Sequence, residues 1–123
     1  MSRVIVTGGR NWGEGPGTVN GYAVCSRILS DMLRPLKPTA IVQGGCRTGA
    51  DLLARWWAKD YAIPCETFHA DWKRYGPSAG PRRNSEMIAA GADYVVACPG
   101  GRGTADCVRK AQAAGLTVIW IGG

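Results

Sequence analysis

Five short runs of apolar and β-branched residues recur along the 123-residue chain and alternate with longer amphipathic segments. The runs are Val4–Thr7, Ala40–Gln43, Cys65–His69, Tyr94–Cys98 and Thr117–Ile121. Most are apolar at consecutive positions, which is typical of strands that helices cover on both faces. Strands that alternate with helices predict a parallel sheet, because parallel neighbours need a crossover connection.

The segment after the first run has the clearest helical spacing. Its apolar residues recur three or four positions apart, as on one face of a helix: Cys25, Ile28, Leu29, Met32, Leu33 and Leu36. Further helices are expected over about Ala50–Tyr61, Arg82–Ala90 and Thr104–Ala114. The chain is therefore expected to form a single Rossmann-like α/β domain over residues 1–123. Its three layers would be a five-stranded parallel sheet, in strand order 3-2-1-4-5, with helices on both faces.

Paired glycines, closely followed by an arginine, stand after three of the expected strands. The three segments are Thr7-Gly8-Gly9-Arg10, Gly44-Gly45-Cys46-Arg47-Thr48-Gly49-Ala50-Asp51 and Pro99-Gly100-Gly101-Arg102-Gly103-Thr104. The carboxyl ends of parallel strands share one edge of the sheet, where such folds bind ligands. Glycine lets the backbone approach a ligand, the first amides of a helix attract anions, and arginine binds phosphate with two donors. These loops predict an anion-binding site, and tight strand-to-helix turns are the alternative.

The glycine spacing excludes two common nucleotide-binding motifs. The segment Gly44–Asp51 lacks the Gly-Lys-Ser/Thr of a P-loop, and neither of the other two loops has the third glycine of GxGxxG. We therefore expect neither an ATPase nor an ordinary NAD-dependent dehydrogenase. Two stretches fit no regular element, Asn11–Asn20 and Ala70–Pro81, and loops of this length are often functional.

The chain carries 15 Lys+Arg against 9 Asp+Glu, a formal net charge of +6. Its cations gather in or beside the expected loops: Arg10, Arg47, Lys73, Arg74, Arg82, Arg83 and Arg102. Such a cluster favours a small phosphorylated ligand over nucleic acid, which more often meets a basic helix face. One histidine and five scattered cysteines predict no metal site and reduced thiols in a cytoplasmic protein. No apolar run approaches the ~20 residues of a membrane span, so no membrane partner is expected.

The segment Pro99–Thr104 resembles the PGGxGT motif of the SLOG superfamily, which includes the lonely-guy phosphoribohydrolases and the DprA/Smf proteins. Segments over nearly the whole chain resemble its YspA/cpYpsA-related branch: Val4–Arg10, Gln43–Asp51, Ala70–Trp72, and Gly80–Asn84 with Met87. The resemblance implies a Rossmann-like fold that binds a nucleotide or nucleotide-derived ligand. No cofactor beyond that ligand is predicted. The resemblance also implies a homodimer, since such relatives commonly pair. Many members occur in actinobacteria and their phages, so a phage protein would act in the host cytoplasm.

These patterns together assign candidate residues for ligand or phosphate binding. They are Thr7, Gly8, Gly9, Arg10, Gly44, Gly45, Arg47, Gly49, Asp51, Arg82, Arg83, Asn84, Pro99, Gly100, Gly101, Arg102, Gly103 and Thr104. Arg82 and Arg83 are expected at a helix start, where cations oppose the helix dipole, and this favours a role in binding a ligand. Trp72 and Tyr75 would either stack on a base or pack the long loop down.

The expected activity depends on one departure from the family motif. Phosphoribohydrolases carry PGGxGTxxE, and Cys107 occupies the position of that glutamate. Asp106 lies about 100° away on a helix and does not simply replace it. Arg83 resembles a catalytic arginine of these enzymes, and Glu86 and Asp106, with Asp51 and Asp71, are the carboxylate candidates. The missing glutamate favours a module that senses or sequesters a nucleotide. Alternatives are N-glycosidic hydrolysis of a nucleoside monophosphate and a DNA-associated role.

Overall fold

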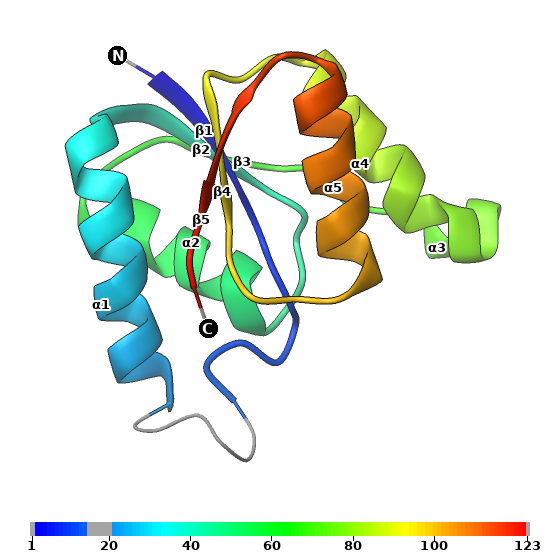
Figure 1. Ribbon diagram of the computed structural model, residues 1–123. Coiled ribbons are helices and arrows are strands. Elements are labelled where there is room, and N and C mark those ends of the chain that lie inside the picture. Colours follow the sequence, from blue (N-terminus) through cyan, green and yellow to red (C-terminus); the bar gives the residue numbers. More distant parts are fainter. Residues whose placement is uncertain (1, 15–20, 123) are drawn as a thin grey trace.

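The computed structural model describes residues 2–14 and 21–122. Figure 1 shows a sheet with helices packed on either side. The elements follow in this order: β1 (Ser2–Thr7), α1 (Gly21–Leu33), the 3-10 turn η1 (Arg34–Leu36), β2 (Pro38–Gln43), α2 (Gly49–Asp60), β3 (Cys65–Thr67), α3 (Trp72–Tyr75), the 3-10 turn η2 (Gly76–Ser78), α4 (Ala79–Ala89), β4 (Tyr94–Ala97), α5 (Arg102–Ala113) and β5 (Thr117–Trp120).

The strands form one parallel sheet in the order β3-β2-β1-β4-β5. This confirms the predicted α/β class and strand order. The chain first crosses from β1 toward β3 and later returns beside β1 to form β4. The topological switch point therefore lies between β1 and β4, where folds of this kind place their ligands.

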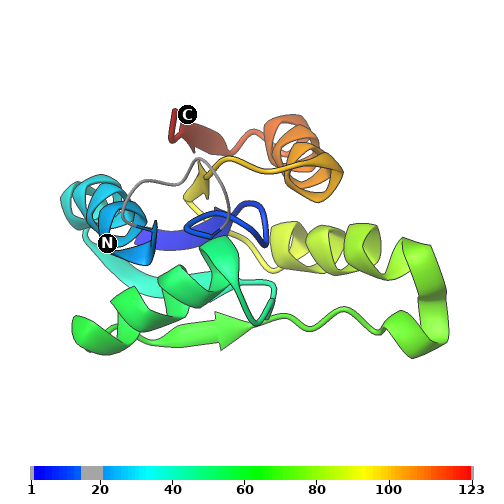
Figure 2. The same cartoon turned by 90° about the horizontal axis from the view of Figure 1, so that it is seen from below.

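Two apolar cores lie on opposite sides of the sheet. Helices α1 and α2 cover one face, and α4 and α5 cover the other (Figure 2). Alternate residues of β1 supply the two cores: Val4 and Val6 pack toward α1 and α2, whereas Ile5 packs toward α4 and α5. All three side chains are fully buried, as the unbroken apolar run predicts.

The first helix is shorter than its apolar spacing suggests. Helix α1 ends at Leu33, and Leu36 belongs to the turn η1 instead. Pro35 stands at the start of this turn, where it removes an amide that a continuing helix would need. Among the described residues, no helix is long and apolar enough to cross a membrane.

The prediction of an irregular loop over Ala70–Pro81 is wrong. This stretch contains α3, η2 and the first residues of α4, which project from the body of the fold in Figure 1. The Asp71 carboxylate caps α3 by accepting a hydrogen bond from the Arg74 amide at 3.2 Å. Pro81 lies in the first turn of α4, where its missing amide breaks no helical bond. Arg82 and Arg83 therefore follow the helix start rather than form it.

The other irregular stretch, Asn11–Asn20, is only partly visible. Residues 11–14 form a turn after β1, and 15–20 lie outside the described residues. The strands β3, β4 and β5 end one or two residues earlier than predicted, at Thr67, Ala97 and Trp120. Their last predicted residues belong to the loops at the carboxyl edge, and this enlarges the part of the chain that can line a site there.

Candidate functional site

A cavity of about 1100 Å³ opens at the carboxyl edge of the sheet, over the switch point between β1 and β4. Its volume slightly exceeds the range of about 300–1,000 Å³ usual for small-molecule sites. Most of the residues predicted for the site line it: Thr7, Gly8, Gly9, Arg10, Gly44, Gly45, Asp51, Trp72, Arg83, Asn84, Pro99, Gly100, Gly101, Arg102, Gly103, Thr104 and Asp106. Segments from four strand ends and from α4 therefore meet at one place.

Six candidates lie outside this lining: Arg47, Gly49, Asp71, Tyr75, Arg82 and Glu86. Arg82 covers the Tyr75 ring, with its guanidinium carbon 4.3 Å from the ring centroid. Its Nε also donates to the Ser78 hydroxyl at 3.2 Å, so the chain itself holds this arginine away from the cavity. The Tyr75 ring is thus covered by arginine side chains. Of the two aromatic residues predicted to stack on a base, Trp72 is the one that lines the cavity.

The glycines around the cavity serve two different purposes. A Cβ atom on Gly8 would lie 2.6 Å from the Ala50 Cβ, and one on Gly100 would lie 2.6 Å from the Gly9 nitrogen. These positions need glycine because the loops pack against each other. By contrast, a Cβ on Gly101 or Gly103 would meet nothing within 4 Å. The open space beside these two is available to a ligand.

Hydrogen bonds join the three glycine loops. The Gly9 amide donates to the Pro99 carbonyl at 2.8 Å, and the Ala50 amide donates to the Gly9 carbonyl at 3.2 Å. The Thr48 hydroxyl donates to the Arg10 carbonyl at 2.7 Å. The β1 loop therefore lies between the other two loops and is bonded to both, as the predicted strand order requires.

The loop between β2 and α2 uses its own side chains to satisfy its amides. The buried Gln43 Oε1 accepts from the Gly45 amide at 2.7 Å and from the Arg55 Nη1 at 3.0 Å. The Asp51 Oδ2 accepts from the Cys46 amide at 3.0 Å. These two amides are therefore not available to an incoming anion.

Asp51 and Arg83 form the polar floor beneath this loop. Burial raises the pKa of Asp51, while the Cys46 amide and the positive charges of Arg83 and Arg55 partly oppose that rise. The Arg83 Nη1 donates to the Gly44 carbonyl at 2.7 Å, and its Nε donates to the Asn84 Oδ1 at 2.9 Å. Arg83 is therefore held in place before any ligand arrives, and it fixes the Gly44 backbone.

The loop between β4 and α5 has different hydrogen-bond partners from the loop between β2 and α2. The first amides of any helix lack intrahelical partners, and Gly101, the N-cap of α5, has no side chain that could accept from them. Arg102 and Arg10 both line the cavity with exposed side chains. Within residues 2–14 and 21–122, neither guanidinium makes a hydrogen bond or an ion pair. This end of the cavity gathers free donors and positive charge.

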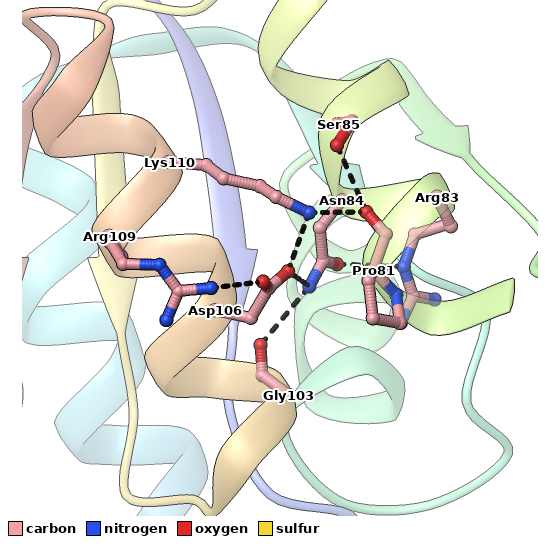
Figure 3. A network of polar contacts seen from close by, with 8 residues as sticks. All are labelled: Pro81, Arg83, Asn84, Ser85, Gly103, Asp106, Arg109 and Lys110. Carbon is pink, nitrogen blue, oxygen red and sulfur yellow. Dashed lines mark hydrogen bonds and ion pairs between the residues drawn. The ribbon is translucent and has the colours of Figure 1, made fainter. Parts of the chain in front are cut away.

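A polar network clamps α4 to α5 beside that loop (Figure 3). The Asn84 Nδ2 donates to the Gly103 carbonyl at 3.1 Å and to the Asp106 Oδ2 at 3.0 Å. Arg109 and Lys110 pair with the same carboxylate at 2.6 and 2.9 Å. Burial by itself would raise the pKa of Asp106, but the hydrogen bonds from Lys110 and Asn84 and the nearby positive charges hold it below its ordinary value. The Asp106 carboxylate is thus kept ionised by its three partners Asn84, Arg109 and Lys110, and this makes it unsuited to proton transfer.

Cys107 faces the core rather than the cavity. It is fully buried in the cluster that contains Ile5 and Val42, and it is not part of the cavity lining. Burial raises the pKa of its thiol, as expected for a small apolar core residue. A glutamate side chain at this position would start from the apolar core rather than from the cavity lining.

Sequence reasoning missed several residues that line the cavity. They are Val6, Asn11, Trp12, Glu14, Cys46, His69, Ala70, Pro77, Gly80, Pro81 and Met87. Most of them flank the predicted loops, and His69 follows the end of β3, so the shared carboxyl edge was an available signal. Pro77 and Gly80 lie in the stretch Ala70–Pro81, whose length indicated a function without pointing to these two residues. No group of three His, Cys, Asp or Glu in the described ranges is arranged to hold a metal ion.

Comparison with known proteins places this geometry in a family. The model of the YspA, cpYpsA-related SLOG family matches residues 2–75, which include the β1 and β2 glycine loops. The "Gene 61 protein" of Mycobacterium phage D29 is 37% identical over 128 residues, which covers 99% of this chain and 98% of that protein. The likeness thus extends through the PGGRGT loop and α5. The chain belongs to the YspA/cpYpsA-related SLOG family.

Proposed function

We propose that the cavity binds a nucleotide or another ribose-phosphate compound and keeps it intact, as a sensing or sequestering module. The arrangement at the start of α5 carries this proposal. Helix amides without a side-chain cap and the open surface of Gly101 and Gly103 lie around the same space. So do Arg102 and Arg10, which have no hydrogen-bond or ion-pair partner among the described residues. Amides and guanidinium groups in this combination favour a phosphate. Membership of the SLOG family supports a nucleotide-related ligand at a general level.

The rest of the cavity suits the remainder of such a ligand. Trp72 lines the end formed by α3, and the residue is 54% exposed, so a base can stack on its ring. Stacking on an aromatic ring contributes about 1–3 kcal/mol per base. The Asp51 carboxylate, beside the β2 loop, is an acceptor for a ribose hydroxyl. The ligand would therefore extend from α5 across the β1 loop toward α3.

Binding without cleavage is favoured by the state of the carboxylates. Asp106 is saturated by cations and an amide, and the position of the motif glutamate is buried as Cys107. Glu86 lies outside the cavity lining. One observation favours N-glycosidic hydrolysis as a second candidate: Asp51 is a buried cavity carboxyl whose pKa is raised by burial, as a general acid or base requires.

Equilibrium dialysis against a panel of nucleoside monophosphates and ADP-ribose-type compounds, with chromatography of both chambers, tests both candidates. The proposal predicts one intact compound enriched on the protein side. Free base together with ribose phosphate would establish hydrolysis instead, and Asp51→Asn should then abolish the release while binding persists. If every compound stays intact and evenly distributed, the nucleotide proposal fails.

We propose the cytoplasm as the location of the protein, or the host cytoplasm if a phage encodes the chain.

DNA binding is the remaining alternative, with single-stranded oligonucleotides as its probe. Retention of an oligonucleotide that weakens steeply with salt, without retention of mononucleotides, would favour a DNA-associated role. Arg10 and Arg102, which have no partner within residues 2–14 and 21–122, line a concave cavity rather than a helix face, and this supports the small ligand.

A further inference from the structure

Asn84 is a buried polar residue of α4 whose side-chain amide is engaged within the protein. The residue is only 2% exposed. Its Oδ1 accepts a hydrogen bond from the Arg83 Nε at 2.9 Å, and its Nδ2 donates to the Gly103 carbonyl at 3.1 Å and to the Asp106 Oδ2 at 3.0 Å. Both hydrogens of the amide therefore have partners in the chain itself, and neither is left for a ligand.

Arg83 extends these hydrogen bonds to the other side of the cavity. Its Nη1 donates to the Gly44 carbonyl at 2.7 Å, so two neighbouring side chains of α4 connect the β2 loop with the start of α5. In Figure 3, Asn84 lies between Arg83 on one side and Gly103 and Asp106 on the other. An amide group suits this position, because it presents an acceptor to the guanidinium and two donors to the carbonyl and the carboxylate.

The bonds from Asn84 end on the first turns of α5, where we have proposed the phosphate site. Gly103 is the second residue of this helix, and Asp106 is the fifth. Donors that already point at an anion bind it better than donors that must first be ordered, because ordering them costs free energy. A side chain that fixes these turns therefore also fixes the direction of the amides that would meet the phosphate.

We propose that Asn84 is a positioning residue for the phosphate site, because it holds the first turns of α5 in the orientation in which the helix amides meet a phosphate group. This inference rests on the proposed function, which assigns phosphate to those turns. Asn84 then acts through α5 rather than by touching the ligand. The charged groups around its amide are Arg83 from its own helix and Asp106 from α5, with Lys110 on the same carboxylate.

Asn84→Asp tests this role, because it removes the two donors and keeps the shape of the side chain. At about pH 8 the new carboxylate would face Asp106 and the Gly103 carbonyl, and repulsion between the acceptors should displace the turn. Isothermal titration calorimetry with adenosine 5′-monophosphate should then give a dissociation constant about tenfold above that of the wild-type protein. Adenosine, which has no phosphate, should bind both proteins alike. At about pH 5 the ratio of the two constants should fall toward one, because a carboxyl beside the Asp106 carboxylate takes up a proton readily and can then donate.

Ser85→Ala is the matched control on the next residue of α4. The Ser85 hydroxyl donates to the Pro81 carbonyl of its own helix at 3.1 Å, so its loss should leave both affinities unchanged. Asn84→Ala adds no charge and serves if Asn84→Asp does not fold, and near-ultraviolet circular dichroism checks each fold. Asn84→Ala should weaken binding of adenosine 5′-monophosphate to the same degree at both pH values.

Amide hydrogen exchange separates this inference from the proposed function, because it needs no ligand. The Ala105 amide, which donates to the Gly101 carbonyl at 3.1 Å, should exchange faster in Asn84→Asp than in the wild-type protein at about pH 8. Equal exchange, or unchanged affinity of the variant for adenosine 5′-monophosphate, overturns the positioning role and leaves the proposed function standing. A wild-type protein that binds no phosphate compound overturns the proposed function, and the role of Asn84 at a phosphate site fails with it.

Discussion

The loop after β2 and the loop after β4 look alike in sequence but differ in structure. Both place two glycines and an arginine before a helix, as GGCRTGAD and GGRGTADC. In the first, Gln43 and Asp51 occupy the amides of Gly45 and Cys46. In the second, no side chain among the described residues accepts a hydrogen bond from a loop amide, and Arg102 lines the cavity, which Arg47 does not. The motif alone therefore does not make an anion site, and the neighbouring acceptors decide it.

The two loops differ because of single residues around them. The strand β2 ends in Gln43, whose amide folds back over the loop, whereas Cys98 after β4 offers no such acceptor. The third residue of α2 is Asp51, and the third residue of α5 is Thr104. The β2 loop is consequently a rigid wall of the cavity. The β4 loop is the part for which we propose phosphate binding.

The largest expected effect is a loss of stability when a tightly packed glycine of the β2 loop is replaced. Gly49 has a φ of +68°, and a Cβ there would lie 2.1 Å from the Gly9 carbonyl oxygen. Gly49→Ala should lower the free energy of unfolding by about 2–4 kcal/mol, through backbone strain and overpacking. Gly103→Ala is the control, because its Cβ meets nothing within 4 Å and should leave stability nearly unchanged. Equal unfolding midpoints in urea for these two variants would contradict the distinction between packed and open glycines.

The next largest expected effect is a loss of ligand affinity when Arg102 is replaced. Arg102→Ala should weaken binding of the nucleotide identified by dialysis by about 1.5–3 kcal/mol, the contribution of a charge-assisted hydrogen bond. Arg82→Ala is a matched loss of one exposed arginine outside the cavity and should leave affinity unchanged. Isothermal titration calorimetry measures both. If the two variants bind alike, Arg102 is not the phosphate ligand.

The smallest expected effect is a difference in how Asp51, beside the β2 loop, and Asp106, in α5, change the stability with pH. The pKa of Asp51 is raised above 3.8, so the folded state holds its proton longer and stability falls as pH rises through that window. The pKa of Asp106 is lowered below 3.8, so its contribution is complete above that value and is lost as pH falls through the folded-state pKa.

Asn variants isolate the two carboxylates. Relative to Asp51→Asn, the wild-type protein should lose stability as pH rises from about 3 to about 7. Relative to Asp106→Asn, it should gain stability over the same range, by about 1 kcal/mol. Urea unfolding across this range measures both differences. Slopes of the same sign would show that the two carboxylates do not have opposite environments.

Much of the fold could be predicted because its signals are local. Apolar runs and helical spacing located every strand, and the rule for parallel sheets placed the glycine loops at one edge. The stretch Ala70–Pro81 failed for a local reason as well. Short helices such as α3 bury almost nothing and so leave no apolar period, and its signals were a single capping aspartate and a proline within the first turn of α4.

Sequence by itself determined the parallel sheet, its order and the group of loops that face the cavity, because each follows from residues close together in the chain. Tertiary structure alone decided which donors remain free. Arg83 bonds the Gly44 carbonyl 39 residues away, and Asn84 bonds Asp106 22 residues away. Arg10 and Arg102 meet no such partner among the described residues. Hydrogen-bond partners are set by distances across the folded chain, and spacing along the sequence does not encode those distances.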